Sequence, residues 1–243
     1  MGTIKGTRKS DNLVGTNRAD TIYGLGGNDT ISAMQGNDKV YGGDGSDLIY
    51  LHSGNDMVDG GKGFDMIGLY YADAGVTLDL ASKVVSIVAG GTSGTTSFKS
   101  IEGVWGSAHG DHISGDGKNN DIFSNEGNDT IFGRGGDDTI NAYTGDDVID
   151  GGAGDDWLFG GKNADTFIFT VGSGSATIMD FAVGKDKIDL SEYEGISTFE
   201  DLNILDGRRG ARIELSENDR LSLDHVRAAD LDASDFIFAD TMV

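Results

Sequence analysis

The sequence contains neither cysteine nor proline, and both absences restrict the kind of protein it can be. Without cysteine there is no disulfide framework and no thiolate metal site. Without proline, the 40 glycines among 243 residues fit neither collagen nor an ordinary disordered spacer. Long apolar runs are missing as well, and no segment approaches the roughly 20 residues of a membrane-spanning helix. We therefore expect no transmembrane segment.

Positive charge is scarce. The 18 Lys and Arg face 41 acidic residues, which gives a formal net charge of −23. The acidic residues are 34 Asp and 7 Glu, and this skew is informative because Asp favours turns and hard cations whereas Glu favours helices. Such a surface repels nucleic acid and anionic lipid, so nucleic acid is excluded and a cation is the expected partner. Solubility or salt adaptation is the alternative, but it would use Glu as freely as Asp.

Catalytic motifs are also missing. The sequence has no HExxH, no GxSxG and no Walker A pattern, so we do not expect an enzyme. Of the four histidines, His109 and His112 lie three apart but lack a third ligand, which argues against zinc. We expect Trp105 and Trp157 to be core or cap residues rather than platforms for sugars.

What is present is a repeat of nine residues. Seven units run without a gap from Gly6 to Gly68, and seven more run from Gly106 to Ile168. Taking GLGGNDTIS (Gly24–Ser32) as the reference unit, position 6 is Asp in 13 of 14 units, the exception being Asn120. Position 8 is Ile, Leu, Val or Phe in all 14, and position 4 is Gly in nine. A low-complexity linker has no reason to keep three positions in phase.

The unit predicts a local structure. Position 8, flanked by positions 7 and 9, is a very short strand with its apolar side chain inward, and the six residues before it form a tight loop. Glycine in that loop permits positive φ and a close approach of backbone carbonyls to a ligand. Two units make one coil, and coils stacked about 4.8 Å apart bury a continuous ladder of Ile and Val. Residues 18 apart should therefore lie one above another.

Stacking places the Asp residues in columns, where unpaired carboxylates repel and a cation between neighbours removes the repulsion. The ligands on offer are hard oxygens, which select Ca²⁺ over zinc or copper and suit Mg²⁺ less well. The strongest pairs have Gly at position 4 on both sides: Asp29/Asp47, Asp38/Asp56, Asp47/Asp65, Asp129/Asp147 and Asp138/Asp156. We expect about five strong sites and at most about ten.

The candidate ligands are loop glycines and position-6 aspartates. They are Gly24, Gly26, Asp29, Gly36, Asp38, Gly43, Gly45, Asp47, Gly54, Asp56, Gly61, Gly63, Asp65, Gly127, Asp129, Gly136, Asp138, Gly145, Asp147, Gly152, Gly154, Asp156 and Asp165. The first two units of each block lack the position-4 glycine, and a cation such as Arg18 or Lys118 stands there instead. These units should be caps, and Asp11, Asp20 and Asp111 should be poor ligands. The last unit departs as well, with Asn163 at position 4.

Units such as GGDGSDLIY and GGAGDDWLF resemble the GGxGxDxUx nonapeptide of RTX (repeats-in-toxin) exoproteins, the hemolysin-type calcium-binding repeat. The resemblance implies an all-β, right-handed parallel β-roll (β-helix) with Ca²⁺ held in the loops between successive turns. Beyond the repeats, TIMDFAVGKDKIDLSEY (Thr177–Tyr193) is similar to the C-terminal domain of serralysin-type proteases and to the R-modules of alginate epimerases. The C-terminal end of this sequence also resembles the uncleaved type I secretion signal found in that family.

We expect two β-roll blocks, 1–68 and 106–168, joined by a β-hairpin insert (69–105) and followed by a C-terminal β cap (169–243). In the insert, 75–80 and 84–89 alternate like strands, and GGTSGTTS (90–97) is expected as a turn or loop. In the cap, ARIELSENDRLSL (211–223) should form a hairpin, and Phe236, Ile237 and Phe238 a final strand.

These observations favour a secreted Ca²⁺-binding protein with a structural or interaction role, which folds on meeting extracellular Ca²⁺. The alternatives are the C-terminal module of a larger secreted enzyme (serralysin-like metalloprotease or mannuronan epimerase) and a free-standing polysaccharide-modifying enzyme. Besides calcium, we expect the type I secretion machinery and an extracellular polysaccharide or cell surface as partners. The N-terminal stretch MGTIKGTRKSDNL has no apolar core, so no cleaved signal peptide is expected.

Overall fold

The structure, a computed structural model, describes residues 1–87 and 94–239. Nearly all regular structure is β, and the helices in this part of the chain are three short 3-10 turns: η1 (Phe199–Asp201), η2 (Ala228–Asp230) and η3 (Ala233–Asp235). None of these helices is long and apolar enough to cross a membrane. The predicted all-β class is confirmed. By its internal contacts the chain forms two units, unit 1 (1–114 with 123–125) and unit 2 (115–122 with 126 onward), and β14 (Asp121–Phe123) falls at their boundary.

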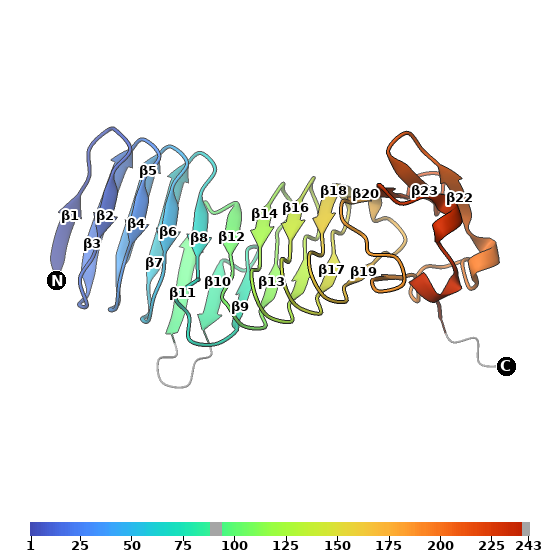
Figure 1. The fold of residues 1–243 in the computed structure, drawn as a ribbon. Coiled ribbons are helices and arrows are strands. Elements are labelled where there is room, and N and C mark those ends of the chain that lie inside the picture. The colour runs from blue at the N-terminus through green and yellow to red at the C-terminus, as the bar shows by residue number, and fades with distance from the viewer. Residues whose placement is uncertain (88–93, 240–243) are drawn as a thin grey trace. The chain divides into compact units, whose positions relative to one another are not determined.

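Unit 1 contains two sheets, and successive strands of the repeats alternate between them (Figure 1). The first sheet runs in the order β1 (Gly2–Lys5), β3 (Asp20–Gly26), β5 (Lys39–Asp44), β7 (Met57–Lys62), β11 (Gly94–Lys99), β10 (Val84–Ile87), β9 (Val76–Asp79) and β13 (His112–Ser114). The second runs β2 (Asn12–Val14), β4 (Thr30–Ser32), β6 (Leu48–Tyr50), β8 (Met66–Gly68) and β12 (Gly103–Trp105). Two repeat units therefore make one coil, as predicted.

The register between coils is 18 residues. Ile31 pairs with Ile49, which pairs with Ile67, and in the other sheet Ile22 pairs with Val40. All five side chains are fully buried, so position 8 forms the predicted apolar ladder. Leu51 and Leu69, which lie two residues after the ladder residues Ile49 and Ile67, are buried as well and add to the core.

The insert continues the first sheet. Strand β11 pairs in parallel with β7, β9 pairs in parallel with β13, and β10 lies antiparallel between β11 and β9. The prediction of a turn or loop over 90–97 is wrong for Gly94–Ser97, which belong to β11, because β-branched Thr96 and then Phe98 turn inward and are buried. Residues 88–93, including the end of the strand expected over 84–89, lie outside the described residues.

Unit 2 also has two sheets. The first is β15 (Thr130–Phe132), β17 (Val148–Asp150), β19 (Thr166–Ile168), β21 (Lys187–Asp189) and β25 (Phe236–Ile237). The second is β16 (Thr139–Asn141), β18 (Gly154–Phe159), β20 (Gly174–Ile178), β24 (Arg220–Asp224), β23 (Gly210–Glu214) and β22 (Asn203–Asp206). Parallel pairing stacks Ile131 on Ile149 and Phe167 on Ile188, which extends the ladder beyond the last repeat.

The C-terminal cap is as predicted for its hairpin and for most of its final strand. Strands β23 and β24 are antiparallel, and β25 pairs in parallel with β21 through Phe236 and Ile188. Phe238 follows β25 rather than belonging to it, and the expected end of the cap, 240–243, lies outside the described residues. The expectation that Trp157 is a core or cap residue is wrong: it lies on the outer face of β18 with 49% of its surface exposed.

Candidate metal centre

The position-6 aspartates form the predicted columns. Within a column, the backbone N–H of a position-6 residue donates a hydrogen bond to the Oδ1 atom of the Asp 18 residues later, which fixes one carboxylate above the next. The N–O distances in the five pairs predicted to be strongest are 2.8 Å for Asp29/Asp47, Asp38/Asp56 and Asp129/Asp147, and 2.9 Å for Asp47/Asp65 and Asp138/Asp156.

These carboxylates are buried, and their second oxygen is left without a partner. The position-6 residues of these five pairs have at most 4% of their surface exposed. Nine Oδ2 atoms are buried and accept no hydrogen bond: those of Asp29, Asp38, Asp47, Asp65, Asp129, Asp138, Asp147, Asp156 and Asp165. A buried, unpaired carboxylate oxygen is costly, about 1–3 kcal/mol or more when the group is charged. The nine oxygens therefore suit a cation as their partner.

Burial raises the pKa of the column carboxyls, because desolvation penalises the charged form. It raises the pKa of Asp138 to about 8 and that of Asp147 to about 7. The pKa is raised to about 6 for Asp38, Asp56, Asp65, Asp156 and Asp165. Charge from neighbouring aspartates adds to the effect in the same direction. A divalent cation beside these oxygens would reverse it by favouring the ionised form.

The raised pKa values predict how the metal-free protein responds to pH. Because these seven carboxyls hold their protons more tightly when the protein is folded than when it is unfolded, they favour folding below about pH 4, and this contribution is lost as pH rises through about 6 to 8. In chelator we expect more folded protein at about pH 4.5 than at about pH 8, with the change in the β signal centred on this window. Circular dichroism at several pH values measures it; a β signal that grows as pH rises would contradict it.

The first aspartates of each block are satisfied by the protein itself. Thr16 donates to Asp20 Oδ2 through its N–H at 2.8 Å and its hydroxyl at 2.6 Å. Thr7 donates to Asp11 Oδ2 through the same two groups. Ser107 donates to Asp111 through both groups. These carboxylates therefore have little capacity left for a cation. The hydrogen bonds arise because position 2 of these units is a hydroxyl residue. The sequence-based prediction considered only position 4 and missed this feature.

Position 2 has a different backbone in the units that carry an unpartnered oxygen. There it is left-handed, with positive φ at Leu25, Met34, Gly43, Gly61, Asn125, Arg134, Tyr143, Gly152 and Gly161. For residues with a Cβ this conformation costs on the order of 1–2 kcal/mol each. Because the position-2 N–H then no longer reaches the carboxylate, the strain leaves Oδ2 free for another partner. Strain repeated at five residues with side chains is typical of a functional loop.

Position 4 requires glycine because the stacked loops leave no room for a side chain, in addition to its positive φ. A Cβ built on Gly45 would lie 2.1 Å from the carbonyl oxygen of Gly27, and one on Gly54 would lie 1.7 Å from that of Gly36. Stacked loops thus bring carbonyl oxygens into close contact with the next coil. Asn163, a departure from the pattern in sequence, adopts a φ of 78° and so preserves the loop, since Asn tolerates this region.

The remaining predicted glycines differ among themselves. A Cβ on Gly24 would come within 2.3 Å of both Asp29 Oδ2 and the Gly42 carbonyl oxygen, so this glycine keeps space open beside the free carboxylate. At Gly26 the nearest atom would be 3.5 Å away, an ordinary contact. Its neighbour Gly27, which has the positive φ of position 4, is the residue that the candidate list omitted.

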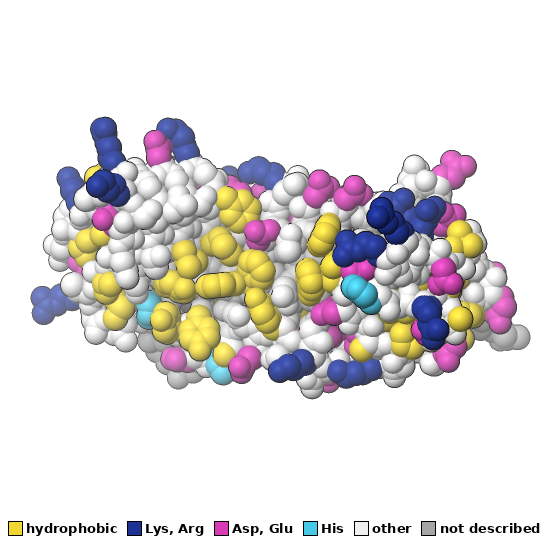
Figure 2. All heavy atoms as spheres, turned by 45° about the horizontal axis from the view of Figure 1, so that its top comes forward, with side chains coloured by type: hydrophobic (Ala, Val, Ile, Leu, Met, Phe, Trp, Pro, Cys, Tyr) yellow, Lys and Arg dark blue, Asp and Glu magenta, His cyan; other side chains and the backbone are white. Residues whose placement is uncertain are grey.

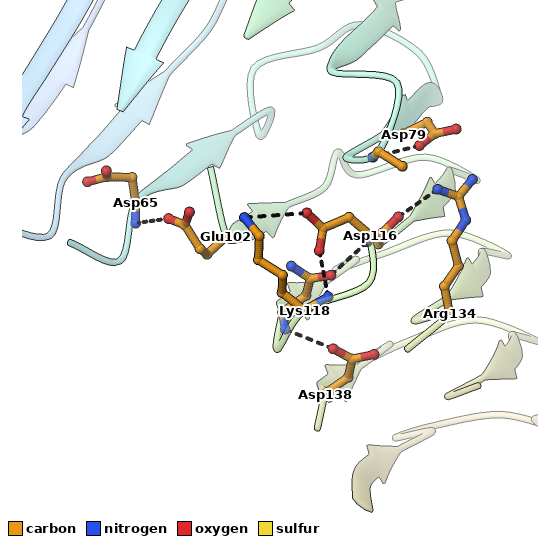
Figure 3. A network of polar contacts seen from close by, with 10 residues as sticks. Asp65, Asp79, Glu102, Asp116, Lys118, Arg134 and Asp138 are labelled. Atoms are coloured by element: carbon orange, nitrogen blue, oxygen red, sulfur yellow. Dashed lines mark hydrogen bonds and ion pairs between the residues drawn. The ribbon is translucent and has the colours of Figure 1, made fainter. Parts of the chain in front are cut away.

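The columns end on residues that the repeat does not contain. Asp56 N–H donates to the Thr96 hydroxyl, whose oxygen also lies 3.5 Å from Asp56 Oδ2, so Asp56 is the least available of the predicted strong ligands. Asp65 N–H donates to the Glu102 carboxylate (Figure 3), and Asp165 N–H donates to Asp186 Oδ1 at 3.1 Å. Of these three column-ending residues, only Asp186 could have been found from the sequence, since Asp186 and Ile188 have the spacing of positions 6 and 8.

The donor set fits Ca²⁺. It combines paired carboxylates with backbone carbonyls, and Ca²⁺ accepts six to eight such oxygens in flexible geometry. In 1–87 and 94–239, no three His, Asp or Glu side chains converge on one point. A site here would therefore rest on Asp pairs and loop carbonyls, as the spacing predicts, rather than on a carboxylate cluster.

Comparison with known proteins gives the same family. A family model described as the RTX calcium-binding nonapeptide repeat (4 copies) matches residues 5–40, 32–67, 105–140 and 132–167, more than half of the chain. A search of curated proteins found no match.

Solved structures include similar folds. The extracellular lipase LipA from Serratia marcescens is 19% identical with a TM-score of 0.48, over 95% of this chain but only 40% of the lipase. The AlgE6R2 and AlgE6R3 subunits of the Azotobacter vinelandii mannuronan C5-epimerase are 29% and 28% identical, with TM-scores of 0.39 and 0.32. They cover 57% and 56% of this chain, and 94% and 82% of their own. Because all three TM-scores are below 0.5, the assignment rests on the repeat itself: the chain belongs to the RTX calcium-binding nonapeptide repeat family.

Proposed function

We propose that this chain is a secreted RTX protein whose folding is coupled to Ca²⁺ bound in the aspartate columns of both blocks. The observation that carries the proposal is the set of nine buried Oδ2 atoms without a hydrogen-bond partner. Where Ca²⁺ is scarce, these carboxylates repel and resist burial, so the chain stays largely unfolded. Where Ca²⁺ is abundant, binding free energy becomes folding free energy, and stacked sites make the transition cooperative.

The extracellular location follows from the same chemistry. Extracellular calcium modules bind with dissociation constants of about 10⁻⁴–10⁻³ M, far above the free Ca²⁺ inside a cell. A chain that is unfolded inside and folded outside suits export through a type I secretion system, with the signal in the C-terminal cap. In this proposal the folded protein has a structural role or mediates an interaction at a cell surface. The same switch would serve as the C-terminal folding and secretion module of a larger enzyme, and this remains the alternative.

Chelation tests the proposal. In EDTA at neutral pH we expect the circular dichroism spectrum to lose its β character, and addition of Ca²⁺ should restore it over a narrow concentration range. Mg²⁺ at the same concentration should restore much less, because it demands a compact octahedron and retains its waters. A β spectrum that neither EDTA nor Ca²⁺ alters would refute Ca²⁺-coupled folding.

A further inference from the structure

Strands β18, β20, β24 and β23 in unit 2 align a row of outward side chains. Their register pairs Trp157 with Thr177, Thr177 with Ser222, and Ser222 with Arg212. At about 4.8 Å between strands, the row is about 14 Å long. Two small hydroxyl residues thus lie between an indole at one end and a guanidinium at the other, which makes the row a shallow groove with a polar floor.

A pocket of about 280 Å³ lies over this row. Besides the four residues of the row, it is lined by Arg208 and Arg209 at the turn between β22 and β23 and by Asp224. Trp157 exposes 49% of its surface here, which is unusual for the residue that otherwise favours burial. An exposed indole face beside hydroxyl groups is the arrangement that binds the apolar face of a sugar ring.

The positive charge of the pocket is also unusual for this chain. The net charge is −23, yet five of the eight arginines lie between 208 and 227. Figure 2 shows Lys and Arg side chains gathered beside hydrophobic and His side chains in the right half of the view. Arg209 is held by the buried Asp224 carboxylate at 3.0 Å, and Arg212 is paired with Glu214. No ion pair involves Arg208 among the residues described, so its guanidinium is available to a ligand.

We propose that this pocket binds a carboxylated sugar, such as a hexuronate residue of an acidic polysaccharide. The ring would lie against Trp157, its hydroxyl groups would face Thr177 and Ser222, and its carboxylate would face Arg208 and Arg212. A neutral sugar would make no use of the arginines, and an inorganic anion would make no use of the indole. One carboxylate per ring also suits a strongly acidic protein better than a densely phosphorylated ligand, which the whole chain repels.

Calorimetric titration with tetragalacturonate, in buffer that keeps the protein Ca²⁺-saturated, tests this proposal. We expect binding to the wild-type chain that is weakened about tenfold or more in Trp157→Ala and in the double variant Arg208→Ala/Arg212→Ala. Arg227→Ala is the matched control, since Arg227 is exposed, pairs with Asp230 and lies outside the pocket. Its affinity should equal that of wild type.

Circular dichroism of each variant in Ca²⁺ separates loss of the pocket from loss of the fold, and thereby from a failure of the proposed calcium switch. Equal affinity for uncharged tetragalactose, displacement by inorganic sulfate at the same concentration, or unchanged binding by the folded pocket variants would each overturn the proposal. So would the absence of binding to folded wild-type protein.

Discussion

Replacing Asp47 by alanine should lower the free energy of unfolding of the Ca²⁺-loaded protein by about 3–5 kcal/mol and reduce the bound Ca²⁺ by two ions. Asp47 lies in the middle of its column: its Oδ1 accepts from Asp29 N–H at 2.8 Å, and its own N–H donates to Asp65 Oδ1. With free Ca²⁺ about 10 to 100 times the dissociation constant, each lost ion removes about 1.4–2.7 kcal/mol. Urea denaturation in excess Ca²⁺, together with equilibrium dialysis, measures both quantities.

Two further variants separate the causes. Asp47→Asn keeps the acceptor for Asp29 N–H and so isolates loss of the charge from loss of the hydrogen bond. Asp11→Ala should leave the ion count unchanged, because Thr7 already satisfies that carboxylate. If Asp11→Ala and Asp47→Ala lost the same number of ions, the assignment of columns and caps would be wrong.

Asp138→Asn should change the stability in opposite directions with and without calcium. Burial raises the pKa of Asp138 to about 8, so in chelator at neutral pH the fold must retain a proton or bury an unpaired charge. Removing the carboxylate relieves this cost and should stabilise the metal-free protein by an amount on the order of a few kcal/mol. In excess Ca²⁺ the same substitution removes a ligand and should destabilise by about 1–3 kcal/mol.

The matched control is Asp44→Asn. Asp44 is exposed and pairs with exposed Lys62 at 2.8 Å, an arrangement that contributes little to stability in water. The fraction of folded protein in chelator and the unfolding midpoint in excess Ca²⁺ should both change only slightly. Destabilisation by Asp138→Asn in chelator as well as in Ca²⁺ would mean that the carboxylate is a hydrogen-bonding element of the fold rather than a cation ligand.

Most of the roll could be predicted because its information is local and repeats. Each unit carries its own inward residue at position 8 and its own Asp at position 6, and the 18-residue register follows from two units per coil. The failures occur where the repeat stops. Strand β11 was missed because its Thr- and Ser-rich sequence reads as a loop, although every second side chain is buried against the sheet. Trp157 was misplaced because its position-7 site faces outward.

Within the candidate site, the aspartate columns could be predicted but the state of their second oxygen could not. That state depends on φ at position 2. The residues there include Leu25, Met34, Arg134 and Tyr143, and none of these residue types predicts a left-handed backbone. The column ends could not be predicted either. Thr96 and Glu102 reach Asp56 and Asp65 from 40 and 37 residues away, across the insert, and no period links them.

The most direct test of the central claim is a crystal structure of the chain grown with Ca²⁺, with the ions located by their anomalous scattering. We predict ions about 2.3–2.6 Å from the Oδ2 atoms that are buried without a partner, among them those of Asp47 and Asp138. We predict none beside Asp11, Asp20 or Asp111, whose oxygens accept from Thr7, Thr16 and Ser107. Ions beside those three, or found only on exposed carboxylates while the columns stay metal-free, would contradict it.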